Sequence, residues 1–365
     1  MRVALDVSAV PPKVAGAGRY VVEIARRLPG AGVDLTLVSR RDDADRWRTW
    51  SPDASVEPLV PVGRAARLVV EAWRLGATPV ARAATVWHGP HYTMPRRGAT
   101  PTVVTIHDLT FFTHPQYHEP TKAAFFRRAI RYASAHARVL VCVSEFTARQ
   151  LDQIVTDHPP IVVAAHGVDL ERFRPETPSP LEGAEPPYLL FLGTIEPRKG
   201  LDTLLEAFAA LSREVPELEL WLAGQAGWAD ESVGHLVDEH PARSRIRRLG
   251  FVDDASLPSL LARARAVVYP SRVEGFGLPV LEAMACGSTV VTSSGTVMEE
   301  IADGAALVCP PGDPTELAAT IQRAIGLDAA TRLDLGRRAR ERAETFTWAS
   351  SVDRHLEAYD LAVRS

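Results

Sequence analysis

Residues 271–287 read SRVEGFGLPVLEAMACG, and this stretch says more than any other about how the chain folds. The apolar run AVVY at 266–269 comes just before it and is typical of a short buried strand. Pro279 suits the first turn of a helix, and Gly287 suits the residue just past its end. The stretch therefore predicts a strand, a glycine turn and a helix.

The predicted turn suits an anion that sits beside a hydroxyl. Its glycines let a ligand approach the backbone closely, and the N–H groups at the start of a helix attract negative charge. Glu282, one turn into the helix, can accept a hydrogen bond from a hydroxyl, and Glu274 precedes the turn. Phosphate beside such a carboxylate indicates a sugar nucleotide. The simpler alternative is a Rossmann-like turn with two surface glutamates.

Both glutamates and the Gly-Phe-Gly-Leu-Pro between them resemble the E-x7-E signature of the retaining glycosyltransferases of family 4. The resemblance implies the GT-B architecture, in which two Rossmann-like α/β domains with doubly wound parallel sheets face each other across a cleft. It also implies that Glu274 contacts the donor sugar and that Glu282 holds the ribose. The turn residues that it places at the donor are Gly275, Phe276, Gly277 and Leu278.

Composition is that of an ordinary globular protein, with 46% hydrophobic and 24% charged residues among 365. A net charge of -4 argues against a nucleic-acid partner. The three cysteines, Cys142, Cys286 and Cys309, lie far apart, so neither a disulfide framework nor a zinc site is expected. No apolar stretch has the length of a signal peptide or a membrane span. We therefore expect a cytoplasmic protein.

Short β-rich runs alternate with helical patterns along the chain, which predicts parallel sheets covered by helices on both faces. The strands are expected at 2–7, 33–40, 85–88, 101–107, 138–144 and 161–166, and then at 188–193, 217–224, 246–252, 266–270, 288–292 and 305–309.

Residues 172–187, RFRPETPSPLEGAEPP, lack periodicity and predict a linker. We expect an N-terminal acceptor domain at 1–171 and a C-terminal donor domain at 188–347. By the resemblance, a last helix at 348–365 crosses back onto the first domain.

The segment FLGTIEPRKGLDTLLEAF at 191–208 predicts a strand, a turn and a helix with Arg198 and Lys199 at the helix entrance. Cations there can clamp a diphosphate and stabilise the charge that grows as it leaves. The resembled family binds the diphosphate at this turn, so Gly193 and Thr194 are expected at the donor. Many members have an arginine where this chain has Thr194.

Two further segments of the second half resemble the nucleotide site of the family. LAGQAG at 222–227 ends a strand in glycines, and Gly224 would leave room for the nucleotide. LGFVDD at 249–254 would place Phe251 and Val252 at the base. Packing of Phe251 in the core is the equal alternative.

The first half carries two segments that resemble donor contacts. AGAGRY at 15–20 resembles the family's glycine loop, so Gly16 and Gly18 are expected to line the cleft, although an ordinary tight turn is the alternative. TIHDL at 105–109 places His107 and Asp108 at the end of a strand, where parallel sheets bind ligands. By resemblance, His107 contacts the transferred sugar. WHGPH at 87–91 either lines the acceptor side or is structural.

Other chemistries find less support. Asp43-Ala-Asp45 has the form of a metal motif but lies in a polar stretch far from the nucleotide motifs, so no metal or other cofactor is expected. Residues 122–136 form a basic, amphipathic pattern that either packs on its own sheet or contacts an anionic membrane.

We therefore expect a retaining hexosyltransferase with Lys199, Arg198, Glu274 and His107 as its catalytic residues. GDP-mannose is the first choice of donor, and a glycan or lipid-linked acceptor of the cell envelope is the first choice of acceptor. The alternatives are a UDP- or dTDP-sugar with a small-molecule acceptor, a nucleotide-sugar epimerase, and a non-catalytic nucleotide-sugar binder.

Overall fold

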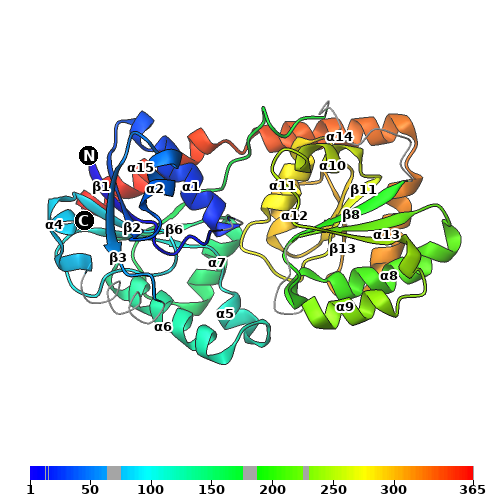
Figure 1. Ribbon diagram of the computed structural model, residues 1–365, viewed down its shortest axis with the longest axis horizontal. Coiled ribbons are helices and arrows are strands. Elements are labelled where there is room, and N and C mark those ends of the chain that lie inside the picture. Colours follow the sequence, from blue (N-terminus) through cyan, green and yellow to red (C-terminus); the bar gives the residue numbers. More distant parts are fainter. Residues whose placement is uncertain (13, 15, 64–74, 176–186, 225–229, 365) are drawn as a thin grey trace. The chain divides into compact units, whose positions relative to one another are not determined.

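The computed structural model describes residues 1–12, 14, 16–63, 75–175, 187–224 and 230–364. The chain divides into two compact units, each with one sheet (Figure 1). The first unit combines Met1–Gly167 with Thr347–Ser365, and the second is Val168–Phe346. Of the predicted linker, residues 176–186 lie outside the described residues.

The first unit contains a parallel sheet with the strand order β3-β2-β1-β4-β5-β6-β7. Its strands are β1 (Arg2–Asp6), β2 (Asp34–Arg40), β3 (Ser55–Val60), β4 (Val86–Gly89), β5 (Thr102–Ile106), β6 (Val139–Cys142) and β7 (Ile161–Val163). Its helices are α1 (Ala17–Arg27), α2 (Ala44–Trp50), α4 (Pro79–Ala83), α5 (Thr110–Thr113), α6 (Pro120–His136), α7 (Glu145–Ile154) and α15 (Trp348–Arg364). Short 3₁₀ turns occur at η1 (Pro29–Ala31), η2 (Leu75–Ala77) and η3 (Pro115–Tyr117).

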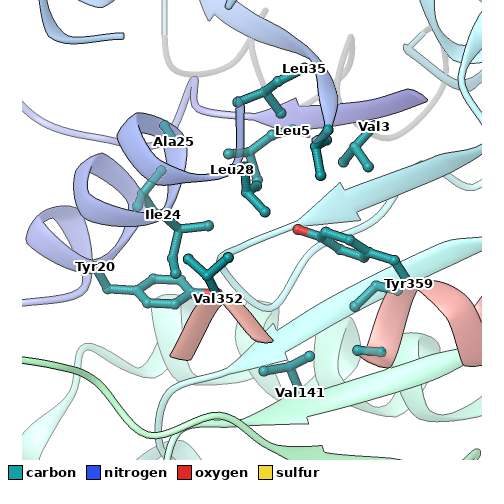
Figure 2. Packing of buried hydrophobic residues seen from close by; sticks show 14 of the residues in the cluster. Val3, Leu5, Tyr20, Ile24, Ala25, Leu28, Leu35, Val141, Val352 and Tyr359 are labelled. Atoms are coloured by element: carbon teal, nitrogen blue, oxygen red, sulfur yellow. The ribbon is translucent and has the colours of Figure 1, made fainter. Parts of the chain in front are cut away.

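One large hydrophobic cluster joins α1 and α15 to the sheet (Figure 2). Ile24 of α1, Leu28 just after that helix and Val352 of α15 are buried in it together with Leu5 of β1. Fully burying such a side chain contributes about 1.5–3 kcal/mol. The helix that ends the chain is therefore part of the core of the first unit.

The sequence pattern did not predict the strand β3. Pro58 lacks the N–H that a ladder needs, and only Val60 of this strand is fully buried, so the hydrophobic alternation is weak. Both features are tolerated because β3 lies at the edge of the sheet.

The second unit contains a parallel sheet with the order β10-β9-β8-β11-β12-β13. Its strands are β8 (Tyr188–Leu192), β9 (Glu219–Ala223), β10 (Ile246–Gly250), β11 (Ala266–Tyr269), β12 (Val290–Ser293) and β13 (Leu307–Cys309). Its helices are α8 (Leu201–Glu214), α9 (Asp230–Asp238), α10 (Leu257–Arg263), α11 (Leu278–Ala285), α12 (Val297–Ala302), α13 (Pro314–Gly326) and α14 (Ala329–Glu344). Its 3₁₀ turns are η4 (Pro197–Lys199) and η5 (Arg243–Arg245).

The predicted fold class is confirmed, since both sheets are parallel and both reverse their strand order next to the first strand of the unit. The reversal lies between β1 and β4 in the first sheet and between β8 and β11 in the second. Ligands of such sheets bind at the carboxyl ends of the strands at this switch point.

The strand, turn and helix predicted from residues 266–287 are confirmed as β11 and α11. Gly277 precedes the helix with φ at 113°, a value that favours glycine. Gly287 follows it with φ at 68°, and its N–H donates to the carbonyl of Met284. The helix therefore starts and stops at the two glycines.

Candidate active site

The switch point of the second sheet brings the predicted clamp and the first glutamate together. Lys199 ends η4, just after β8, and Glu274 follows β11, which is the neighbour of β8. Gly200 allows this approach, because a Cβ there would come within 2.2 Å of the carbonyl oxygen of Pro270. Residues 75 positions apart thus meet at one edge of the sheet.

Glu274 is the centre of this cluster. Its Oε2 accepts from Nη1 of Arg198 at 2.7 Å, and its Oε1 accepts from Nζ of Lys199. The hydroxyls of Tyr269 and Ser271 donate to the same Oε1 at 3.0 and 2.9 Å. With 9% of Glu274 exposed, the carboxylate is held by two cations and two hydroxyls in a nearly closed site.

The electrostatics follow from two cations around one anion. Burial favours the neutral form of Glu274, but Arg198 and Lys199 outweigh it and lower the pKa of the carboxyl to about 2. Burial and the repulsion of Arg198 lower the pKa of Lys199, while Glu274 acts in the opposite direction. Burial and Glu274 raise the pKa of Tyr269, so its hydroxyl stays a donor. Glu274 is therefore an anion at neutral pH.

Arg198 is held by a second carboxylate as well. Its Nε donates to Glu196 Oε2 at 2.8 Å, so the arginine lies between Glu196 and Glu274. Its own carbonyl accepts from the backbone N–H of Arg272 at 2.7 Å, which ties η4 to the segment after β11. The guanidinium is thus oriented from two sides before any ligand contacts it.

Sequence reasoning missed Tyr269 and Ser271. Lys199 Nζ donates to the Tyr269 hydroxyl at 2.6 Å, and Ser271 Oγ also lies 3.0 Å from the carbonyl oxygen of Arg198. Both residues stand at the carboxyl end of β11, in the run AVVYPS. A polar group that ends an apolar strand at a switch point was the signal that could have found them.

Gly193 follows β8 and Gly224 follows β9, and the two glycines pack against each other at the carboxyl edge of the second sheet. A Cβ on Gly224 would lie 1.8 Å from the carbonyl oxygen of Gly193, so the two turns touch backbone to backbone. Only glycine fits at 224, because the Gly193 backbone fills the space of a side chain; room for a nucleotide at this turn stays a prediction. Thr194 is half-buried beside Gly193. Residues 225–227 of the predicted turn lie outside the described residues.

The turn before α11 is almost fully buried, including Gly275 and Phe276, and so is Leu278 at the start of the helix. The ring of Phe276 packs edge-on against Phe346 at 6.0 Å. Glu282 is also buried, one turn into α11. The predicted reading with both glutamates on the surface is therefore wrong.

Phe251 follows β10, and 57% of its surface is exposed. The predicted alternative, packing of this ring in the core, is wrong. Val252 beside it is half-buried. An exposed aromatic ring at the carboxyl edge of the sheet is suited to stacking on a nucleobase.

In the first unit, His107 and Asp108 stand directly after β5, as predicted. His107 is buried, and its Nε2 lies 2.7 Å from the carbonyl oxygen of Pro90. Asp108 Oδ2 accepts from the Tyr92 hydroxyl at 3.0 Å, and its Oδ1 accepts from the Thr110 hydroxyl at 2.6 Å. The structure thus orients both side chains, and their contact with a donor stays a prediction.

Gly16 and Gly18 lie at the start of α1, where Gly16 is the residue before the helix, with φ at 50°. Gly16 is exposed and Gly18 is buried. Lys13 and Ala15 of this loop lie outside the described residues.

Asp43 is engaged by arginines. Its Oδ2 accepts from Arg46 at 2.6 Å and from the indole N–H of Trp47 at 3.2 Å. Asp45 pairs with Arg48 at 2.6 Å. Among the described residues, no group of three or more His, Cys, Asp or Glu side chains could hold a metal ion.

Comparison with known proteins decides the family. Residues 173–342 match the model of glycosyl transferases group 1, and residues 14–172 match that of glycosyltransferase family 4. An Escherichia coli protein named O-antigen chain mannosyltransferase B is 30% identical over 99% of this chain and all of its own length. The chain is a family 4 glycosyltransferase.

Other relatives agree with this assignment. The D-inositol 3-phosphate glycosyltransferase of Salinispora tropica is 29% identical to this chain. The match covers 95% of this chain and 81% of the Salinispora protein. The structure of sucrose-phosphate synthase from Thermosynechococcus elongatus superposes with a TM-score of 0.80, at 22% identity and full coverage of both chains. That likeness confirms the GT-B fold. None of the described helices of the glycosyltransferase is long and apolar enough to cross a bilayer.

Proposed function

We propose that the glycosyltransferase moves mannose from GDP-mannose, with retention, to a hydroxyl of a cell-envelope or polysaccharide glycan. The buried cluster of Arg198, Lys199 and Glu274 carries this proposal, because it joins a diphosphate clamp to a carboxylate that can bind a sugar hydroxyl. The mannosyl donor is supported by the E. coli relative, which aligns with almost the whole chain and is named a mannosyltransferase.

In the proposed reaction, the bond from C1 of the sugar to the diphosphate oxygen breaks, and a bond from C1 to the acceptor oxygen forms on the same face. The proton of the acceptor hydroxyl passes to the departing phosphate. Arg198 and Lys199 balance the charge that develops on that phosphate, without a metal. Glu274 and His107 bind the sugar, and Glu282 binds the ribose.

The hydrogen bonds of Glu274 to Arg198 and Lys199 also affect how the donor binds. A diphosphate that binds Arg198 and Lys199 competes with Glu274 for the same N–H donors. As the phosphate takes over those donors, the carboxylate becomes able to accept from the sugar hydroxyls. Donor binding and orientation of the sugar are therefore coupled at one side chain.

A second candidate is transfer from a UDP- or dTDP-sugar to a small phosphorylated acceptor. The observation that favours it is the Salinispora relative, whose name states a D-inositol 3-phosphate glycosyltransferase and which covers 95% of this chain. This reading keeps the diphosphate clamp and changes only the base and the acceptor.

Thermal shift against GDP-, UDP- and dTDP-sugars and their free nucleotides tests the donor. A ligand at 100 times its dissociation constant adds about 2.7 kcal/mol of stability, which raises the melting temperature by several degrees. We expect a shift with GDP and GDP-mannose. A response to uridine or thymidine nucleotides alone selects the second candidate, and no response to any nucleotide contradicts both.

The donor that binds is then used with glycan, lipid-linked and inositol phosphate acceptors, and the anomeric configuration of the product is read by NMR. Retention gives an α-linked mannoside from GDP-α-mannose. A β-linked product would overturn the retaining reaction while leaving the donor assignment intact.

A further inference from the structure

A continuous chain of hydrogen bonds crosses the core of the first unit. Tyr20 of α1 joins two of its members, with its hydroxyl 2.9 Å from Thr105 Oγ1 and 2.7 Å from His355 Nε2. Thr105 Oγ1 lies 2.8 Å from His88 Nε2, and His88 Nδ1 lies 2.8 Å from the Tyr359 hydroxyl. All five side chains are fully buried. The chain therefore joins α1, β4 and β5 to α15.

The direction of every bond follows from one backbone carbonyl. His355 Nδ1 lies 2.6 Å from the carbonyl oxygen of Ser351, which can only accept, so Nδ1 carries the proton and Nε2 accepts. Tyr20 must then donate to His355. Because each hydroxyl has one proton, Thr105 donates to Tyr20 and His88 Nε2–H donates to Thr105. The Tyr359 hydroxyl donates to His88 Nδ1.

The groups of the chain are neutral, as this assignment requires. Burial lowers the pKa of His355 to about 4 and lowers that of His88 well below its usual value. Burial also raises the pKa of Tyr20 and of Tyr359, so both keep their protons. The two histidines are thus opposite tautomers at neutral pH, with Nε2–H on His88 and Nδ1–H on His355.

The ring of Tyr20 also supports His107. The two rings meet edge to face, with centroids 5.1 Å apart and planes at 78°. The rings of His91, Tyr92 and His166 also contact His107, with centroids 5.5, 5.6 and 6.1 Å away. The Nε2–H of His107 donates to the carbonyl oxygen of Pro90 at 2.7 Å. That bond leaves Nδ1 as the acceptor of a neutral imidazole. Among these rings, Tyr20 has its centroid nearest to that of His107, and it is the one tied by its hydroxyl to α15.

We infer that Tyr20 is a positioning residue for His107, and that His355 of α15 holds Tyr20 in place by accepting its proton. The inference rests on the proposed glycosyl transfer, in which His107 contacts the transferred sugar. On this inference α15 does more than pack against the sheet, because it also helps to position His107 for the reaction. It also makes the chain asymmetric, because the bonds between Ser351 and Tyr20 act on His107, whereas Tyr359 at the far end does not.

Tyr20→Phe tests this inference, with Tyr359→Phe as the matched control. Each variant removes one buried phenol hydroxyl and keeps its ring. With the donor and acceptor that support turnover, we expect Tyr20→Phe to lower kcat by about 10- to 100-fold through misplacement of His107, with the donor KM nearly unchanged. Tyr359→Phe should stay within about threefold of the wild type, because Ser351 still directs the remaining bonds.

Histidine tautomers give a readout that loss of stability alone does not move. In protein with ¹⁵N-labelled histidine rings, wild type should show His88 as the Nε2–H tautomer and His355 as the Nδ1–H tautomer. Tyr20→Phe should shift the ring signals of His107, and Tyr359→Phe should leave them in place. This measurement needs no substrate, so it decides the inference even if no donor is turned over, an outcome that would count against the proposed function only.

Either of two kinds of result, one kinetic and one spectroscopic, would overturn the inference. One is the same loss of kcat in both variants, which indicates a general cost of losing a buried hydroxyl. The other is the same tautomer for His88 and His355, or unchanged His107 signals in Tyr20→Phe. Far-UV circular dichroism and melting temperature, measured for both variants, check that each is folded.

Discussion

At the scale of single residues, the negative charge of Glu274 has two opposite effects on the site. Its charge offsets the repulsion between Arg198 and Lys199, and the same charge opposes the arrival of a diphosphate. Glu274→Gln keeps the shape and removes the charge, so the two effects can be separated.

We expect Glu274→Gln to bind the free nucleoside diphosphate more tightly, by about fivefold, since one nearby negative charge is gone. Turnover should nevertheless fall by about 100- to 1000-fold, because the sugar loses its charged acceptor. Titration calorimetry and steady-state kinetics measure the two quantities. Weaker nucleotide binding would show that Glu274 stabilises the clamp and does not compete with the ligand.

Lys199 is expected to act mainly on the departing phosphate. Lys199→Ala should lower kcat by about 100- to 1000-fold, the usual effect of losing one charge-stabilising donor. Arg213→Ala, at an exposed position on α8, is the control and should leave kcat unchanged. Near-normal turnover of Lys199→Ala would contradict its place in the clamp.

Residue types and their local spacing were enough to find Glu274, Lys199 and Arg198, because each lies in a short motif next to a strand. Tyr269 and Ser271 were missed, since a tyrosine and a serine near a strand end are common in any protein. Tyr20 and His355 are 335 positions apart, and no local pattern relates them. Contacts made across the fold were therefore beyond a reading of neighbouring residues.

At the scale of elements, α6 presents a basic face with one exposed aromatic ring. Ala123, Ile130 and Ala133 are buried against the first unit, while Phe125 points outward and is 38% exposed. Lys122, Arg128 and Arg131 are exposed on the same helix. The helix thus packs on its own unit and still offers a surface of the kind that contacts anionic lipids.

We expect the protein to bind vesicles that contain phosphatidylglycerol through this face, which would bring it to a lipid-linked acceptor at the inner face of the membrane. Arg128→Glu makes the net charge of this face more negative by two units. Each unit contributes about 1 kcal/mol near an anionic surface, so binding should fall by roughly tenfold or more. Arg213→Glu, at an exposed position on α8, is the charge-matched control. Equal binding of both variants in vesicle sedimentation would remove α6 as the contact.

Strands in the middle of the sheets were predictable because burial on both faces produces continuous apolar runs, as in VLVC of β6 and AVVY of β11. The edge strand β3 lacks that signal. One side of this strand has no neighbouring strand, so Glu57 and Pro58 are tolerated there. Helix limits were predictable where glycine or proline marks them, as at α11.

At the scale of the whole molecule, buried neutral histidines make stability depend on pH. Burial lowers the pKa of His88, His107, His166 and His355 below 6.5, so the unfolded chain binds protons that the folded protein cannot. Their contribution is complete above about pH 6.5 and is lost progressively below it, for His355 down to its folded pKa of about 4. Glu274 destabilises the fold only below its own ordinary pKa of 4.5.

With its pKa at about 4, His355 alone should cost on the order of 2 kcal/mol of unfolding free energy between pH 7 and pH 5. The melting temperature should therefore fall by several degrees over this range, in which Glu274 does not titrate. Calorimetry at pH 7, 6 and 5 measures it. A constant melting temperature would mean that the histidines become protonated without opening the core.

The position of α15 has a consequence for how the protein is made. Its residues complete the core of the first unit, yet they follow the whole second unit in the chain. A ribosome must therefore synthesise Val168–Phe346 before Tyr20 can meet His355. The first unit begins to form early in translation and reaches its final packing only when the last helix has left the exit tunnel. Until then, the apolar surface that α15 covers has no helix packed on it, and exposed surface of that kind favours aggregation of incomplete chains.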